Sequence, residues 1–195
     1  MGSEMCIRDS LITEYFQKLW ALITGKLAKN VELAVIDVLV QLIDECITIP
    51  QPVVELLMSA YSQDPHTSTY MASTSICQAT QDRLQKHVAR YFSESFLETL
   101  ESNDDEDEDD NVTALEQLHQ QIVNVAEAAP SLLTSVVPNL ESELHSDRVH
   151  VRLLATRALG TLFALPSNVS EGFATLHSHV WKAWLGRAID KHVPI

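Results

Sequence analysis

The stretch from Leu140 to Phe163, LESELHSDRVHVRLLATRALGTLF, decides the fold of this chain. It predicts the end of one helix, a short turn at 145–147 and a second helix. Apolar residues recur in the second helix at the spacing of one helix face, namely Val151, Leu154, Ala155, Ala158, Leu159 and Leu162. The small Ala155 and Ala158 would let two helix backbones approach closely. Asp147 precedes the second helix and is expected to cap its free N–H groups.

This pattern resembles the second helix of a HEAT repeat, a helical hairpin that stacks on copies of itself. The residues that carry the resemblance are Asp147, Val151, Arg152, Ala155, Ala158 and Leu159. In a stacked array, Arg152 is expected to reach the turn of the neighbouring repeat. A repeat scaffold presents surface to other macromolecules, so the stretch directs the functional interpretation toward protein binding.

The rest of the chain repeats the same organisation. First helices are expected to begin near residues 11, 52, 86, 130 and 171, and second helices near residues 31, 66, 112 and 148. This period of about 35–45 residues is typical of helical-hairpin repeats. The second helix of the first hairpin has an apolar face of its own, formed by Val31, Ala34, Val35, Val38, Leu39, Leu42, Ile43 and Cys46. We therefore predict an all-α fold, an α-solenoid of about four to five HEAT-like hairpins with the last one truncated.

The predicted solenoid divides the chain into four segments. Residues 1–10, MGSEMCIRDS, look like a leader that is either non-native or disordered, and residues 11–101 form HEAT-like repeats. Residues 102–111 are expected to form an acidic disordered loop, because like charges repel one another and bury nothing. Residues 112–195 continue the repeats and end within a hairpin, with Thr113 and Glu116 as a capping box at their start.

The composition excludes several classes of function. The 195 residues carry a net charge of −14, and eight of the 27 acidic residues lie between Glu101 and Asp110. The remaining 19 acidic residues face 13 scattered basic ones, so nothing suggests a nucleic-acid surface. The acidic run itself is interpreted as a solvated loop or as a contact for a basic partner, with Ser102 as a candidate site for an acid-directed kinase.

No pattern in the chain points to catalysis or to a bound group. The three cysteines have neither metal-ligand nor disulfide spacing, and no window is apolar enough for a membrane span. His177 and His179 fall on different faces of a helix, which argues against a shared metal. We expect no catalytic residue, no metal and no cofactor. The pair Trp181 and Trp184 is interpreted as helix core, with a binding hot spot as the alternative.

A second motif resembles one family of repeat proteins. Val137-Pro138-x-Leu140 precedes the signature helix, and the end of the chain carries Trp181, Leu185, Gly186, Arg187, Asp190, His192, Val193, Pro194 and Ile195. Together they look like the amino-terminal half of the family of sister chromatid cohesion proteins named precocious dissociation of sisters five.

The resemblance implies a non-enzymatic scaffold on chromatin in the nucleus. It further implies binding to the cohesin complex through its kleisin subunit, and cooperation with the wings-apart-like release factor. A HEAT scaffold of another class, such as a transport receptor or a phosphatase scaffold, is the alternative, because the repeat pattern alone does not separate these functions.

Overall fold

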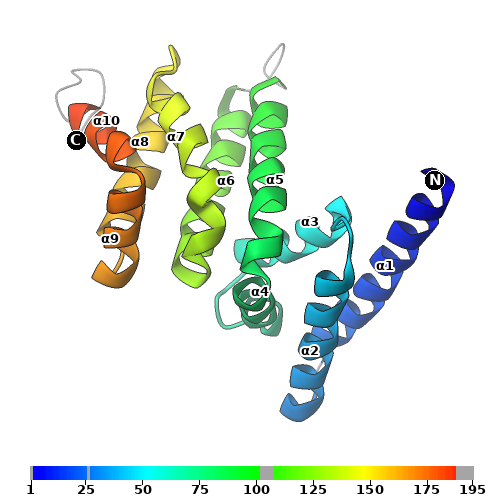
Figure 1. The fold of residues 1–195 in the computed structure, drawn as a ribbon. Helices are drawn as coiled ribbons and strands as arrows, with labels where there is room; N and C mark the ends of the chain where they lie inside the picture. The colour runs from blue at the N-terminus through cyan, green and yellow to red at the C-terminus, as the bar shows by residue number, and fades with distance from the viewer. Residues whose placement is uncertain (1, 26, 102–107, 188–195) are drawn as a thin grey trace. The chain divides into compact units, whose positions relative to one another are not determined.

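A computed structural model describes residues 2–25, 27–101 and 108–187, and these ranges hold helices and turns but no strand (Figure 1). The prediction of an all-α chain agrees with this content. The chain divides into two units, residues 1–91 and 92–195, and the boundary falls inside one long helix, α5 (Gln81–Glu101). Each unit is considered separately.

Unit 1 holds the first helices of the chain. Its elements before α5 are α1 (Gly2–Ile23), α2 (Lys29–Glu45), α3 (Gln51–Ser59), the 3-10 helix η1 (Ala60–Ser62) and α4 (Ser68–Ala79). α1 packs against α2, α3 and α4, and α2 packs against α4. Pro52 occupies the first turn of α3, where a missing N–H costs nothing. The Thr67 hydroxyl accepts a hydrogen bond from the Tyr70 backbone N–H and so caps α4.

The helix expected from residue 66 to residue 85 is in fact two helices, the whole of α4 and the start of α5. α4 ends at Ala79, and α5 begins at Gln81 rather than near residue 86. Between them, the Thr80 hydroxyl and the Thr80 N–H both donate to the Ile76 carbonyl, at 2.8 and 3.0 Å, which closes the last turn of α4. α5 also carries Arg83, whose guanidinium donates to the carbonyls of Asp44 and Cys46 at the end of α2.

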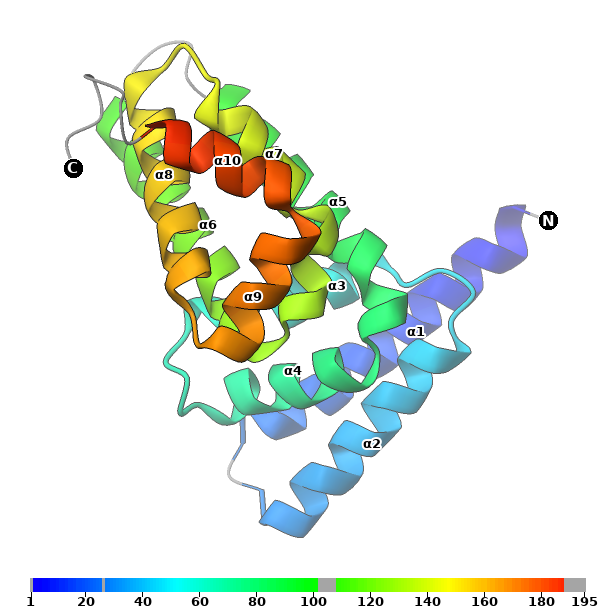
Figure 2. The same cartoon turned by 60° about the vertical axis from the view of Figure 1, so that its left-hand side comes forward.

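Unit 2 contains the segment that decided the fold. Its elements after α5 are α6 (Glu108–Ala128), the 3-10 helix η2 (Pro130–Ser135), α7 (Val137–Leu144), α8 (Val149–Ala164), α9 (Ser167–Leu176) and α10 (Ser178–Arg187). α8 packs against α6, α7, α9 and α10, and Figure 2 shows α10 alongside α7 and α8. All six apolar residues predicted to face inward from α8 are buried.

Several predicted boundaries in this unit are wrong. α6 begins at Glu108, so Thr113 and Glu116 lie inside the helix and form no capping box at its start. The expected helix from Pro130 opens as the 3-10 helix η2, and α7 follows only at Val137. The final helix divides at His177, whose N–H closes α9 on the Phe173 carbonyl at 2.9 Å.

The ends of the predicted segments also differ from the described helices. α1 begins at Gly2, nine residues before the expected start at Leu11, so the described helix includes most of the segment taken as a leader. Residues 102–107 of the acidic run lie outside the described residues, as do residues 188–195. The interpretations placed on Ser102 and on the end of the chain therefore stay predictions.

Candidate functional site

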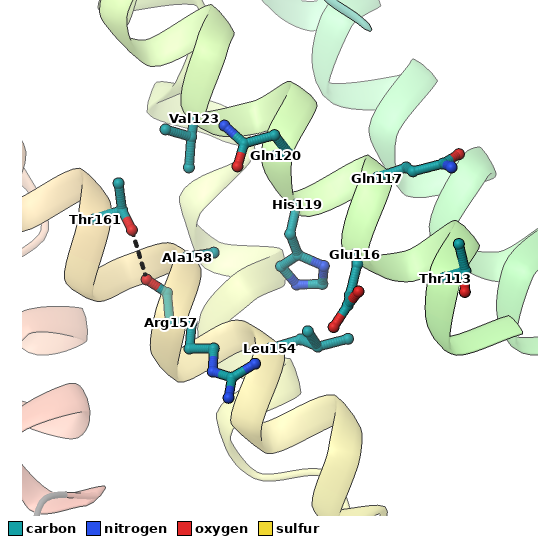
Figure 3. Close-up of a pocket in the computed structure, with 10 residues that line it drawn as sticks. All are labelled: Thr113, Glu116, Gln117, His119, Gln120, Val123, Leu154, Arg157, Ala158 and Thr161. Carbon is teal, nitrogen blue, oxygen red and sulfur yellow. Dashed lines mark hydrogen bonds between the residues drawn. The ribbon is translucent and has the colours of Figure 1, made fainter. Parts of the chain in front are cut away.

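A groove of about 390 Å³ runs between α6 and α8 within unit 2 (Figure 3). Its α6 wall carries Thr113, Glu116, Gln117, His119, Gln120 and Val123, and its α8 wall carries Leu154, Arg157, Ala158 and Thr161. The size lies within the range of sites that bind small ligands or short peptide segments. Four of the groove residues, Thr113, Glu116, Leu154 and Ala158, had been assigned only structural roles from the sequence.

The floor of the groove is fixed by a buried polar pair. The His119 ring donates from Nδ1 to the Leu115 carbonyl at 2.7 Å, and its Nε2 lies 2.8 Å from Glu143 Oε2 on α7. Both side chains are buried, and the Phe96 ring meets the imidazole edge-on with 5.4 Å between centroids. His119 is thereby held by contacts to α5, to its own helix and to α7.

The hydrogen-bonding chemistry of this pair follows from its two acceptors. Because a carbonyl can only accept, Nδ1 must carry a proton. A single further proton then lies between Nε2 and Oε2, either as imidazolium with carboxylate or as neutral imidazole with carboxylic acid. The pair is electrically neutral in both forms, which is the condition under which two ionisable groups are tolerated in a buried site.

The walls of the groove carry charges that the described residues do not neutralise. Figure 3 shows Glu116 and Arg157 extending from the two opposite helices. Neither side chain forms an ion pair or a side-chain hydrogen bond with any residue in the described ranges; the bond drawn at Arg157 runs from the Thr161 hydroxyl to its backbone carbonyl, at 3.0 Å. Buried Val123, Leu154 and Ala158 supply apolar surface between them.

The predicted signature residues lie in α8 and in the turn before it, but Asp147 acts differently from expectation. Val151, Ala155, Ala158 and Leu159 are buried, as the helical spacing required. Asp147 does not cap α8, because the cap position is Arg148 and no side chain bonds there. Arg152 donates to the carbonyls of Ser146 and Asp147, at 2.7 and 3.0 Å. It therefore contacts the turn of its own hairpin, and its reach to a neighbouring repeat's turn stays a prediction.

The described part of the terminal motif packs on α8. The Trp184 indole N–H donates to the Thr156 carbonyl at 2.9 Å, and the Trp181, Trp184 and Phe163 rings contact one another. A Cβ atom at Gly160 would lie only 3.3 Å from the Trp184 ring, so the glycine makes room for the indole. This packing agrees with the core interpretation, although both tryptophans are only half-buried.

The remaining motif residues are either at the surface or outside the description. Leu185 is exposed, and Gly186 has open space around it. Arg187 Nη2 lies 3.1 Å from His145 Nδ1. Asp190, His192, Val193, Pro194 and Ile195 fall outside the described residues, so their roles stay predictions.

Two observations concern the ionisable residues of the described ranges. No group of three histidine, cysteine or acidic side chains that could hold a metal occurs there. Burial raises the pKa of the Cys77 thiol to about 11, so the thiol is protonated at neutral pH and is a poor nucleophile. None of the described helices is long and apolar enough to cross a membrane.

Sequence reasoning missed the pair of His119 and Glu143. A signal was available, because His119 stands one residue after Leu118 and three before Ile122, on the apolar face of α6. A buried histidine needs a partner. The sequence could not say which of the nearby acidic residues supplies it, since that depends on how α6 packs beside α7.

Comparisons with known proteins agree with the fold and with the resemblance. A family model described as "Sister chromatid cohesion protein PDS5 protein" matches residues 5–195. The sister chromatid cohesion protein pds5 of Schizosaccharomyces pombe is 26% identical over 200 residues, covering 95% of this chain and 16% of its own length. The human PDS5 homolog A is 24% identical over 191 residues, covering 96% and 13%.

A solved structure also matches. The chain is similar to a protein in the structure of a Pds5–Scc1 complex, with a TM-score of 0.78 and 23% identity over 94% of this chain and 28% of that one. This likeness confirms the predicted α-solenoid of HEAT-like hairpins. The chain spans less than a fifth of the length of the curated relatives named above.

Proposed function

Since this chain belongs to the PDS5 family of sister chromatid cohesion proteins, we propose that it forms part of a non-enzymatic scaffold that regulates cohesin on chromatin. The scaffold acts by binding other proteins and contributes to the maintenance and release of sister chromatid cohesion. The family match from residue 5 to residue 195 carries this proposal, because it covers both described units.

The partners proposed for the full-length protein are the kleisin subunit of cohesin and the wings-apart-like release factor. Support for the first comes from the similar solved protein, which was captured in complex with Scc1. Support for a nuclear, chromosome-associated location comes from the relatives, whose names assign them to sister chromatid cohesion. A stack of helical hairpins suits this role, since each hairpin adds outward-facing surface that other proteins can contact.

The absence of catalysis is proposed on chemical grounds. Within the described residues, the polar pair at the groove floor is already mutually bonded, and the thiol of Cys77 is held in its protonated form. Neither group offers an activated nucleophile. The open groove walls provide binding contacts only.

Co-precipitation tests the proposal most directly. The full-length protein that contains this chain, tagged and expressed in cells of its source, is expected to recover the kleisin and the other cohesin subunits. An unrelated HEAT-repeat protein with the same tag serves as the control. Recovery of no cohesin subunit above that control, from cells whose cohesin is intact, would contradict the proposed function.

A further inference from the structure

The groove between α6 and α8 has the dimensions of a short peptide. Its shorter wall, on α8, runs from Leu154 to Thr161, a distance of about 10 Å at 1.5 Å per helical residue. An extended peptide rises about 3.3 Å per residue, so about three residues fill this length. The groove is thus too short for a folded domain and long enough for a tripeptide within a larger segment.

The two walls present opposite charges to anything that lies between them. Arg157 on α8 offers a guanidinium, which binds carboxylates with two parallel hydrogen bonds. Glu116 on α6 offers a carboxylate, the natural partner of a lysine or arginine. Both side chains are exposed, and neither is neutralised by another described residue. An occupant that carries both an acidic and a basic side chain would satisfy both walls.

Between these charges, the apolar surface of the groove fits a small apolar side chain. Val123, Leu154 and Ala158 are buried and line the groove, and Ala158 leaves space where a larger residue would fill it. Gln117 also lines the groove from α6, and its side chain is exposed. Its amide can both donate to and accept from a peptide backbone.

The floor is also rigid before any ligand arrives. His119 is held by two hydrogen bonds and by the Phe96 ring, so its position does not depend on an occupant. A site that is already in its binding conformation loses less entropy when a ligand binds.

We propose that this groove is a docking site for a short extended peptide segment of a partner protein, in which a small aliphatic residue is flanked by an acidic residue on one side and a basic residue on the other. The acidic side chain pairs with Arg157, the basic one pairs with Glu116, and the aliphatic side chain sits over Leu154 and Ala158. The assignment goes beyond the proposed function, because it concerns this groove whichever protein supplies the segment.

A positional peptide library tests the charge pattern. Nine-residue fluorescent peptides with a fixed central valine would carry glutamate, lysine or alanine at each neighbouring position, and their affinity for the full 195-residue chain would be measured by fluorescence polarisation. We expect glutamate on one side combined with lysine on the other to bind best. Removal of either charge should weaken binding about tenfold, as for other charge-assisted hydrogen bonds.

Charge reversal in the protein makes the test specific to the groove. Arg157→Glu should reverse the preferred residue at the acidic position from glutamate to lysine, and Glu116→Lys should reverse the preference at the other position. Both positions are exposed, so the fold tolerates the changes, which circular dichroism would verify. Lys182→Glu on α10 makes the same change in net charge as Arg157→Glu, but away from the groove, and should leave the preferences unaltered.

Three results would overturn the assignment. These are a folded wild-type chain that binds no peptide of the library, binding without charge preference, and an Arg157→Glu variant that keeps the wild-type preference. Each of them is independent of cohesin recovery by the full-length protein, so a failure of the groove proposal is distinguishable from a failure of the proposed function.

Discussion

Helices α2 and α8 carry similar apolar patterns, yet they bury them to different extents. The whole predicted face of α8 is buried, because α6, α7, α9 and α10 pack around it. On α2, Val35, Leu39 and Ile43 are buried, whereas Val31 and Val38 of the same predicted face are exposed. α2 packs chiefly against α1 and α4. An apolar period therefore shows that a helix has a face to bury, and its neighbours decide how much of that face is covered.

The sharpest test of this contrast places the same charge on each helix. Ala155→Asp in α8 should destabilise unit 2 by at least about 3 kcal/mol, since Ala155 is completely buried and the carboxylate has no partner. Ala34 in α2 is exposed, so Ala34→Asp should lower the free energy of unfolding by at most about 1 kcal/mol, mainly because aspartate has a lower helix propensity. Hydrogen exchange measured helix by helix would detect both effects.

The comparison would fail if the two substitutions reduced the hydrogen-exchange protection of their own helices equally. It would also fail if Ala155→Asp left the amides of α6, α7 and α8 as protected as in the wild type. Either result would show that α8 is not the packed centre of unit 2.

The second test addresses the polar pair that joins α6 to α7. Glu143→Leu should cost about 3 kcal/mol, because it leaves the His119 imidazole buried without its partner. The double variant with His119→Leu should be more stable than this single variant, since both polar groups are then gone. Chemical denaturation of the two single variants and the double variant gives the coupling energy between His119 and Glu143. Strictly additive losses of stability would refute the pairing.

The third test separates a hydrogen bond from ring packing at the other side of α8. Trp184→Phe removes the indole N–H that donates to Thr156 and should cost about 1 kcal/mol beyond the loss of ring area. Trp181→Phe is the matched control, because it trims a half-buried ring of the same cluster. The Trp184→Phe variant should have a lower melting temperature than the Trp181→Phe variant. Equal melting temperatures would argue against the bond.

The smallest expected effect is a dependence on pH near α10. Burial lowers the pKa of His177 below its usual value of 6.5, and the nearby His179 lowers it further, against a weaker opposing effect of Glu141. Below about pH 6.5, the unfolded chain therefore binds more protons than the folded chain. The free energy of unfolding is highest above that pH and decreases as the pH falls. His177→Gln should flatten this decrease in denaturation curves recorded between pH 7.5 and 5.5. An unchanged slope would contradict the assignment.

Much of the fold was predictable because it depends on local rules. The period of three to four residues located α8 and its buried face, and the proline near the start of α3 marked a helix boundary. Boundaries were missed at Thr80 and at His177, because neither position has a proline or glycine beside it to mark a break in the sequence. The contact of Arg152 with its own turn was not predictable, because a long side chain can reach its own turn or the next one, and the sequence does not distinguish them.

The groove was not predictable from the sequence. Glu116 and Arg157 are 41 positions apart, and each alone is an ordinary exposed charge on a helix. Their opposition across a gap arises only from the packing of α6 beside α8. The partner of His119 was hidden for the same reason, since Glu143 belongs to another helix.

The burial of the pair at the groove floor has a consequence for ionic strength. At 1 M salt, the screening length in water falls to about 3 Å, which weakens surface contacts such as that between Lys18 and Glu14, whose side chains are 66% and 56% exposed. His119 and Glu143 are 5% and 10% exposed, so dissolved ions cannot come between them. A high-salt wash should therefore release a charged peptide bound by Glu116 and Arg157 while the His119–Glu143 pair stays bonded. Removal of the salt should then restore binding at once.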